Sequence, residues 1–265
     1  MADLSRVEGL LIDIDGVLTV SGVPIAGSPE AVARLRAAGV PFRLMTNTTE
    51  MTRRQLVQQL ADAGFQVTAE EIVTAVLMTA DYLKTEHPGA RCFLLGGPDS
   101  TEDLEGIELA REQADVVVIG GSSRSFDWDD MNHALRLALD GAPLVGMHRT
   151  VAWMVTDGLA LDTGVMLLNA IEAATGREAV VCGKPAQQAF KAGLHELGLP
   201  AERVAMVGDD VNTDALAAQS CGVAGVLVRT GKFRDDVLDR ATGRPDAVID
   251  SLADLPGLLR ARSSR

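Results

Sequence analysis

The sequence of 265 residues predicts an α/β fold in which a parallel core sheet is interrupted by a second α/β unit. Three observations support this prediction. Short apolar runs alternate with amphipathic segments over the first 74 residues, the alternation restarts between residues 75 and 181, and the C-terminal third resumes it. Such alternation is typical of a parallel sheet covered by helices on both faces. We therefore expect a Rossmann-like core formed by residues 1–74 and 182–265, with an inserted α/β cap domain at 75–181.

The first expected strand is the apolar run that begins at Leu10 and ends in two aspartates and a glycine. A helix should begin at Ser28, as its N-cap with Pro29 in the first helical position, and should stop at Gly39. The other elements expected in this unit are a strand at 41–45, a helix at about 50–63 and a short strand at 72–74.

The middle and the end of the chain show the same pattern. In the middle we expect helices at about 75–86, 129–139 and 165–174, and strands near 92–95, 116–119 and 144–145. In the last third we expect helices at about 186–197, 213–219 and 252–259, and strands at 204–207, 224–228 and 247–249. Because this last third resumes the pattern of the first 74 residues, one core sheet with an insertion is the simplest arrangement.

The composition excludes several classes of partner. The chain carries 24 basic and 37 acidic residues, a net charge of −13, which argues against nucleic acid and anionic membranes as partners. It does not argue against a phosphate substrate, because a local cationic site can lie within an acidic protein. The three cysteines are scattered and odd in number, which favours a reducing cytoplasm. Neither a signal peptide nor an apolar run of ~18 residues, as a membrane helix needs, is apparent.

Polar residues stand at four predicted strand ends or loops. They are Asp13 with Asp15, Thr46 with Asn47, Lys184, and Asp209 with Asp210 and Asp214. Ligands of open α/β sheets bind beyond the carboxyl ends of the strands, so these groups should converge if the strands are neighbours. Carboxylates, an ammonium and a hydroxyl suit a divalent cation and a phosphoryl group, and Mg²⁺ prefers such oxygen ligands. Taken alone, the first aspartate pair has a structural interpretation as a turn with about equal weight.

In this order, the four segments resemble the four motifs of the haloacid dehalogenase (HAD) superfamily. Residues 13–17 (DIDGV) resemble the first motif and residues 208–214 (GDDVNTD) the fourth, with Thr46-Asn47 and Lys184 between them. Well over a hundred residues separate Asn47 from Lys184. This layout resembles the branch with a large α/β cap between the second and third motifs, which includes p-nitrophenyl phosphatases, pyridoxal phosphatase and phospholysine phosphohistidine inorganic pyrophosphate phosphatase. Residues 229–232 (RTGK) also resemble this branch.

The resemblance implies a phosphatase. In the family, dehalogenases lack the second aspartate, here Asp15, whereas phosphatases and phosphomutases keep it. The mutases usually carry a helical cap between the first two motifs, and the interval of about thirty residues between Asp15 and Thr46 is too short for one. We therefore expect hydrolysis of phosphate monoesters, with a small phosphorylated metabolite as substrate.

The resemblance also implies a role for each site residue. Asp13 is the expected nucleophile, which forms an aspartyl-phosphate, and Asp15 is the expected general acid and base. The expected Mg²⁺ ligands are Asp13, the main-chain carbonyl of Asp15, Asp209 and Asp214, the last through a metal-bound water. Thr46, Asn47 and Lys184 should bind the phosphoryl group. For Asp210, support of the metal site and capping of the next helix stay open as alternatives.

Two other functions stay open at this point. One is a non-catalytic relative that binds a phosphorylated ligand or a protein partner, and the other, with less support, is a phosphotransferase. The intact set of Asp13, Asp15, Lys184 and Asp209 favours the phosphatase, because a binding module has no need of both early aspartates. Relatives of this type are often dimers, so a homodimer is a possible assembly.

Overall fold

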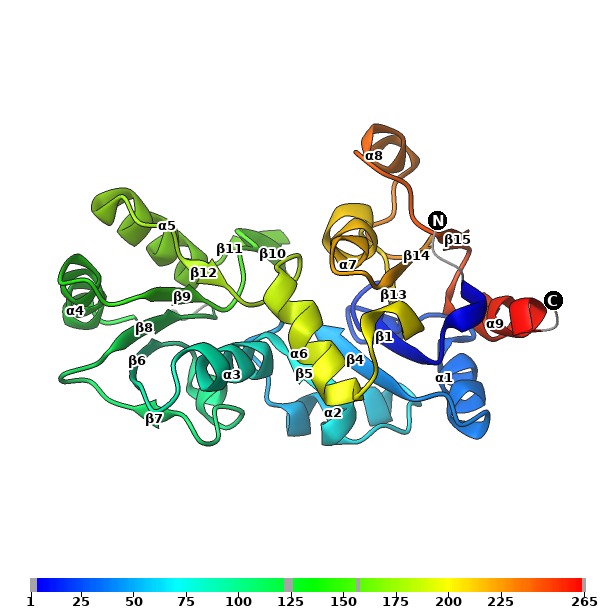
Figure 1. Cartoon of the computed structure of the whole chain (residues 1–265), viewed down its shortest axis with the longest axis horizontal. Helices are drawn as coiled ribbons and strands as arrows, with labels where there is room; N and C mark the ends of the chain where they lie inside the picture. The colour runs from blue at the N-terminus through cyan, green and yellow to red at the C-terminus, as the bar shows by residue number, and fades with distance from the viewer. Residues whose placement is uncertain (1–3, 122–125, 156–157, 264–265) are drawn as a thin grey trace. The chain divides into compact units, whose positions relative to one another are not determined.

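The computed structural model describes residues 4–121, 126–155 and 158–263, and the predicted α/β class is confirmed (Figure 1). The chain divides into two compact units. The core unit contains Met1–Thr46, Arg53–Val73 and Lys184–Arg265, and the insert unit contains Asn47–Thr52 and Thr74–Gly183. Among the described residues, no helix is long and apolar enough to cross a membrane.

The core unit contains a six-stranded sheet in the order β15-β14-β13-β1-β4-β5. Its strands are β1 (Gly9–Asp13), β4 (Phe42–Thr46), β5 (Ile72–Thr74), β13 (Val204–Gly208), β14 (Ala224–Val228) and β15 (Ala247–Ile249). β1 pairs in parallel with β4 on one side and β13 on the other, and all five of its residues are buried. A strand covered on both faces is expected to be continuously apolar, as this one is. A small antiparallel pair, β2 (Thr19–Val20) and β3 (Val23–Pro24), follows β1.

Helices cover both faces of this sheet (Figure 1). α1 packs with α9, and α6 packs with α7 on the opposite face. The helices are α1 (Ser28–Ala37), α2 (Arg53–Asp62), α6 (Gln187–Leu197), α7 (Ala217–Ser220), α8 (Asp235–Arg240) and α9 (Leu255–Ser263). Shorter helical turns are η1 (Leu4–Arg6), η2 (Ala69–Glu71), η4 (Ala201–Arg203), η5 (Val211–Leu216) and η6 (Leu252–Asp254).

Three predicted helix starts in this unit are wrong. Ser28 is not the N-cap of α1; Gly27 is, and the Ser28 hydroxyl donates to the carbonyls of Leu18 (2.9 Å) and Ile25 (2.7 Å) instead. The helix expected from residue 50 begins at Arg53. The helix expected at 213–219 begins earlier, at Val211, and its first part is a π-helix. The capping rules located the right segments, but the Ser28 hydroxyl binds preceding carbonyls instead of capping α1, and Asp210 caps the helix at Val211 two residues earlier than expected.

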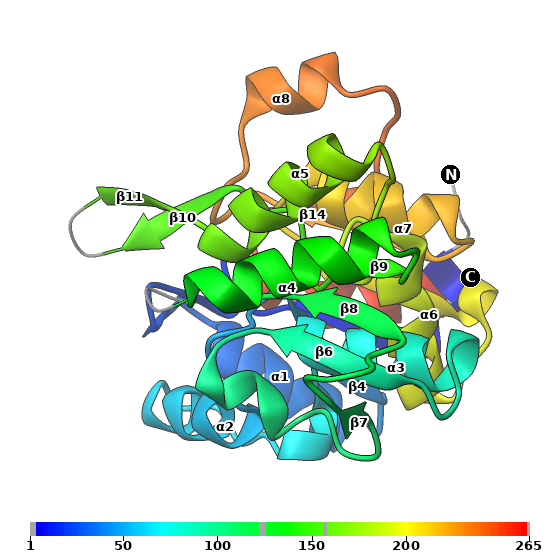
Figure 2. The ribbon, with the colours of Figure 1, turned by 90° about the vertical axis from the view of Figure 1, so that its left-hand side faces the viewer.

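The insert unit contains a five-stranded parallel sheet in the order β12-β9-β8-β6-β7. Its strands are β6 (Arg91–Leu95), β7 (Glu108–Leu109), β8 (Val116–Ile119), β9 (Leu144–Gly146) and β12 (Val180–Val181), beside the antiparallel pair β10 (Ala152–Val155) and β11 (Gly158–Leu161). Its helices are α3 (Ala75–Glu86), α4 (Trp128–Leu139) and α5 (Thr163–Thr175), with the turn η3 (Pro98–Thr101). α4 and α5 pack on the sheet through one apolar cluster that includes Phe93, Val117, Ala134 and Leu168 (Figure 2).

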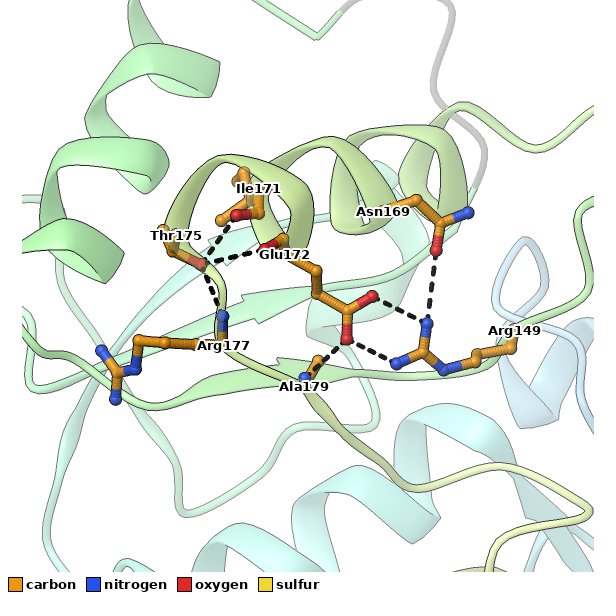
Figure 3. Close-up of polar contacts among 7 residues, drawn as sticks. All are labelled: Arg149, Asn169, Ile171, Glu172, Thr175, Arg177 and Ala179. Carbon is orange, nitrogen blue, oxygen red and sulfur yellow. Dashed lines mark hydrogen bonds and ion pairs between the residues drawn. The ribbon is translucent and has the colours of Figure 1, made fainter.

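A polar network fastens the C-terminal half of α5 to its surroundings in the insert unit (Figure 3). The Arg149 guanidinium binds the Glu172 carboxylate through two nitrogens, at 2.5 and 2.9 Å. The same carboxylate accepts the Ala179 N–H at 2.6 Å, and Arg149 also donates to Asn169. This paired geometry holds the pKa of Glu172 below its usual range. Arg149 is therefore engaged within its own unit.

Candidate active site

The strand register brings three of the predicted segments to one edge of the core sheet. Asp13, the last residue of β1, lies opposite Met45 of β4, so that Thr46 follows immediately beside it. On the other side, Ile12 lies opposite Val207 of β13, so that Asp209 follows just beyond the end of that strand. Asp13, Thr46 and Asp209 are all buried. The convergence at the carboxyl end of the sheet expected from the sequence is thus present for these segments.

Lys184 lies between two carboxylates of this edge. Its Nζ is 2.9 Å from Asp13 Oδ1 and 2.8 Å from Asp214 Oδ1, and the exposed fraction of the Lys184 residue is only 4%. A buried ammonium is costly unless it is paired and hydrogen-bonded, and the two aspartates supply this pairing. The carboxylates in turn raise the pKa of Lys184 above its usual value, against the opposing effect of burial, so that the side chain is cationic at neutral pH.

Three carboxylates form a candidate cation site. Asp13, Asp209 and Asp214 each place one carboxylate oxygen within 4.8 Å of the other two. Together with the Lys184 ammonium, the ionised set carries a net charge of −2, which a divalent cation would neutralise. Oxygen-only donors of this kind suit Mg²⁺. The Asp15 carboxylate is not in this group, and the prediction for Asp15 concerns its main-chain carbonyl.

One atom of the cluster points to cation binding more directly. Asp209 Oδ1 is buried and has no hydrogen-bond partner among the described residues, whereas Oδ2 accepts the Lys232 N–H at 2.7 Å. A buried carboxylate oxygen without a partner carries the full cost of its lost hydration. A cation bound beside Asp13 and Asp214 would satisfy it. The residues present therefore fit a divalent metal ion.

Burial raises the pKa of all three carboxyls of the cluster. Desolvation is the main cause, and it raises the pKa of Asp13, of Asp209 and of Asp214 to about 6 from the ordinary value of 3.8. Lys184 opposes this rise at all three, and the mutual repulsion of the carboxylates adds to it. The metal-free cluster thus binds protons that a cation would displace.

These raised pKa values predict that the metal-free protein becomes less stable as the pH rises, which is the opposite of the effect of a carboxyl whose pKa is lowered by folding. A carboxyl whose pKa rises from 3.8 to about 6 on folding costs the folded state about 3 kcal/mol once it is ionised. The folded state then binds more protons than the unfolded chain between these values, so stability should fall as pH rises through this window. The measurement is urea unfolding in EDTA from pH 4.5 to 7.5, compared with Asp209→Asn.

As the pH rises across this range, we expect the wild type to lose stability relative to Asp209→Asn. Saturating Mg²⁺ should abolish the decline of the wild type, because deprotonated carboxylates bind the cation. A difference that is constant with pH in EDTA would contradict the raised pKa of Asp209.

Asp210 caps the helix that carries Asp214. Its carboxylate accepts the N–H groups of Asn212 (2.9 Å) and Thr213 (3.0 Å), which confirms the capping alternative for its side chain. Its main-chain N–H donates to Asp214 Oδ2 at 3.2 Å. A Cβ on Gly208 would lie 2.2 Å from the Asp214 Cβ, so that only glycine leaves room for this carboxylate. Asp210 and Gly208 therefore help to place Asp214 without joining the carboxylate cluster.

Asp15 differs from its neighbours because its side chain is exposed. It lies in a tight turn in which the Gly16 N–H donates to the Thr19 carbonyl at 2.7 Å. Surrounding protein atoms still limit its hydration and raise the pKa of Asp15 above its usual range, while Lys232 and Lys184 act in the opposite direction. A carboxyl in this setting can exchange protons with a bound molecule.

The predicted binding residues Thr46 and Asn47 belong to different units. Thr46 ends β4 in the core unit and is buried at the edge described above. Asn47 is the first residue of the insert unit, where its Oδ1 lies 2.8 Å from the position of a Cβ on Gly183. Asn47 thus packs against the chain just before Lys184, and its contact with a phosphoryl group stays a prediction.

Residues 229–233 contribute to the site, although no role could be assigned to them from the sequence. The Lys232 N–H donates directly to the Asp209 carboxylate. A main-chain donor has no side-chain signature, so only the Thr-Gly-Lys sequence at the end of a predicted strand pointed to it.

Two family models match this chain. The model described as haloacid dehalogenase-like hydrolase matches residues 10–110, which contain the first two motifs. The model described as HAD-hydrolase-like matches residues 181–255, which contain Lys184 and the segment around Asp209. Both matches therefore include residues of the site.

Similar proteins extend over nearly the whole chain. Phospholysine phosphohistidine inorganic pyrophosphate phosphatase from Rattus norvegicus is 36% identical over 262 residues, which cover 97% of this chain and 95% of the relative. Haloacid dehalogenase-like hydrolase domain-containing protein 2 from Bos taurus is 35% identical over 251 residues, 95% of each chain. Among solved structures, p-nitrophenyl phosphatase from Archaeoglobus fulgidus is similar with a TM-score of 0.87 and 34% identity, covering 95% of this chain and 99% of that one. The 4-nitrophenylphosphatase from Thermotoga maritima is similar with a TM-score of 0.88 and 28% identity, covering 98% of this chain and 100% of that one. With relatives this similar over this length, the chain belongs to the haloacid dehalogenase-like hydrolase family.

Proposed function

We propose that this HAD-family phosphatase hydrolyses phosphate monoesters of small molecules with the help of Mg²⁺ and through an aspartyl-phosphate on Asp13. The observation that carries the proposal is the pairing of Lys184 with both Asp13 and Asp214 beside the unsatisfied oxygen of Asp209. The proposed nucleophile, a fixed cationic group and a candidate cation site then lie together at the carboxyl end of the core sheet. The phosphatase names of the relatives and of the similar structures support the same reaction class.

In the first proposed step, a carboxylate oxygen of Asp13 attacks phosphorus while the bond from phosphorus to the leaving oxygen breaks. Asp15 donates its proton to that oxygen, so the leaving group departs as a neutral alcohol. The raised pKa of Asp15 supports this role, because a carboxyl that holds its proton longer is a better acid near neutral pH.

In the second step, water attacks the phosphorus of the aspartyl-phosphate and Asp15 takes the proton of that water. The bond between phosphorus and the Asp13 oxygen breaks, which releases inorganic phosphate and restores the carboxylate. Lys184 offsets negative charge on the phosphoryl oxygens in both steps, and Thr46 is proposed to donate a hydrogen bond to one of them. A divalent cation held by Asp13, the Asp15 carbonyl, Asp209 and Asp214 would supply Lewis-acid stabilisation of that charge when bound.

Further proposals concern the cap, the class of substrate and the assembly of the protein. Residues 75–181 would act as a cap that excludes water and selects the leaving group, with Asn47 assisting at the phosphoryl group. The chemistry of the site suits a small phosphorylated metabolite, and the scattered, odd number of cysteines supports the cytoplasm as the compartment. A homodimer is the proposed assembly, because members of the HAD branch that the sequence resembles are often dimers.

The proposal is tested with p-nitrophenyl phosphate as substrate, with Mg²⁺ and after its removal by EDTA. We expect turnover with Mg²⁺, a loss of at least about 10²-fold in EDTA, and recovery when Mg²⁺ is restored. A folded protein that binds Mg²⁺ but turns over neither this ester nor a panel of phosphorylated metabolites would favour the non-catalytic alternative.

A further inference from the structure

The segment Arg229–Phe233, which the proposed reaction does not use, lies against the turn that follows β1. The Thr230 hydroxyl donates to the Gly16 carbonyl at 2.5 Å, across 214 residues of sequence. A Cβ on Gly16 would lie 3.1 Å from the Gly231 Cα, so the two backbones are in close contact. The Phe233 N–H donates to the Thr230 carbonyl at 3.1 Å and closes the segment into a turn. Thr230 therefore ties this turn directly to the loop that carries Asp15.

The same turn encloses one oxygen of Asp209. Asp209 Oδ2 accepts the Lys232 N–H at 2.7 Å. A Cβ on Gly16 would lie 1.9 Å from this oxygen, and one on Gly231 would lie 2.1 Å from it. Both glycines have positive φ, 83° and 60°, which other residues rarely adopt. The carboxylate is therefore held between two glycine backbones and a main-chain donor.

The two oxygens of Asp209 thus have different surroundings. Oδ2 is fixed by the chain, while Oδ1 is buried and has no partner among the residues that the structure describes. A carboxylate fixed through one oxygen presents the other in one orientation. Removing a group that orients a metal ligand in this way typically lowers the metal affinity 10- to 100-fold.

We propose that Thr230 is a positioning residue for the cation site: its hydroxyl anchors the turn 229–233 to Gly16, and this turn fixes the Asp209 carboxylate so that Oδ1 is presented to the cation. The inference rests on the proposed function, because it assumes that Asp209 binds a divalent cation. It adds to that function a residue that touches neither the cation nor the substrate.

The main test measures Mg²⁺ binding by titration calorimetry for the wild type, Thr230→Val and Thr230→Ser. We expect Thr230→Val, which keeps the shape but loses the donor, to weaken Mg²⁺ binding by about 10-fold or more. Thr230→Ser, which keeps the hydroxyl, should stay within about threefold of the wild type. At saturating Mg²⁺, kcat and KM of Thr230→Val should return close to the wild-type values, because the residue does not contact the substrate.

Thr175→Val is the matched control. The Thr175 hydroxyl also donates to a main-chain carbonyl, that of Ile171 at 2.8 Å, but in the insert unit (Figure 3). It should leave Mg²⁺ binding unchanged. If folded Thr230→Val binds Mg²⁺ within about twofold of the wild type, or if Thr230→Ser is as weak as Thr230→Val, the inference is wrong.

A second pair of variants keeps the inference testable if Thr230→Val does not fold. Gly231→Ala places a methyl group 2.1 Å from Asp209 Oδ2, and Gly222→Ala imposes similar strain at φ 79° with its nearest neighbour 3.7 Å away. Only Gly231→Ala should lose Mg²⁺ binding by more than about 10-fold. Equal losses in both variants would contradict the role of the turn. A wild type that neither binds Mg²⁺ nor hydrolyses esters would instead overturn the proposed function.

Discussion

Replacing Asp13 with asparagine should lower kcat for p-nitrophenyl phosphate by at least about 10³-fold while the protein stays folded. The neutral amide keeps the shape of the side chain but lacks the anionic carboxylate oxygen that attacks phosphorus, so no aspartyl-phosphate can form. Lys184 keeps its second partner, Asp214, at 2.8 Å, and therefore is not left as an unpaired buried cation. We expect the free energy of unfolding to change by no more than about 2 kcal/mol, as measured in urea with EDTA.

Asp239→Asn is the control for this substitution. It makes the same chemical change at an exposed side chain of α8, and should leave kcat and stability unchanged. If Asp13→Asn retains wild-type turnover with unchanged Mg²⁺ dependence, Asp13 is not the nucleophile. If it is inactive only because it unfolds, circular dichroism and the urea transition will show this.

Replacing Lys184 with methionine should damage both activity and stability. Loss of the ammonium removes the charge that offsets the phosphoryl oxygens, and we expect kcat to fall by about 10²- to 10³-fold. In EDTA the variant also leaves three buried carboxylates without their cationic partner, which should cost about 3–5 kcal/mol near pH 8. Without Lys184 the pKa of Asp13 and of Asp214 should rise further, because Lys184 lowers both.

The size of this destabilisation should depend on pH, which distinguishes a loss of charge from a simple loss of packing. Near pH 5 the carboxyls of the variant are protonated and need no counter-charge, so the destabilisation should be small there and grow towards pH 8. Mg²⁺ should restore part of the stability at pH 8. Lys191→Met, on the exposed surface of α6, is the matched control and should be neutral at both pH values. A loss that is equal at pH 5 and pH 8 would show that Lys184 acts through packing rather than charge.

The sequence predicted most of the fold because the central strands β1, β8, β13 and β14 are fully buried and therefore continuously apolar. β8, β14 and β15 have the predicted bounds, and α3 does as well, since apolar runs and helix stops mark their ends clearly. The pairs β2–β3 and β10–β11, the strands β7 and β12 and the helix α8 were not predicted. These elements have two to six residues each, and the described residues of β3 and of α8 include no buried side chain, so hydrophobic periodicity cannot detect them.

For the site, the sequence identified which residues meet but not how they are held. Asp13, Lys184, Asp209 and Asp214 lie together in the core unit, where Asp13 ends β1 and Asp209 follows β13, as expected at the carboxyl end of an α/β sheet. The capping role of Asp210 could not be chosen from the sequence, because both alternatives need the same residue at the same position. The enclosure of Asp209 by Gly16 and Gly231 depends on bringing together residues 16 and 209, which are 193 positions apart, and no local pattern encodes such a contact.

The central claim is that the phosphoryl group of the substrate is transferred to Asp13, and acid quenching during turnover tests it most directly. Wild-type protein is mixed with p-nitrophenyl phosphate and Mg²⁺, quenched in acid within milliseconds, and digested for tandem mass spectrometry. We expect a peptide that carries one phosphoryl group on Asp13, and no such peptide from Asp13→Asn or from samples in EDTA. Turnover with a phosphoryl group only on another residue, or with an equal phosphopeptide signal in Asp13→Asn, would contradict the account.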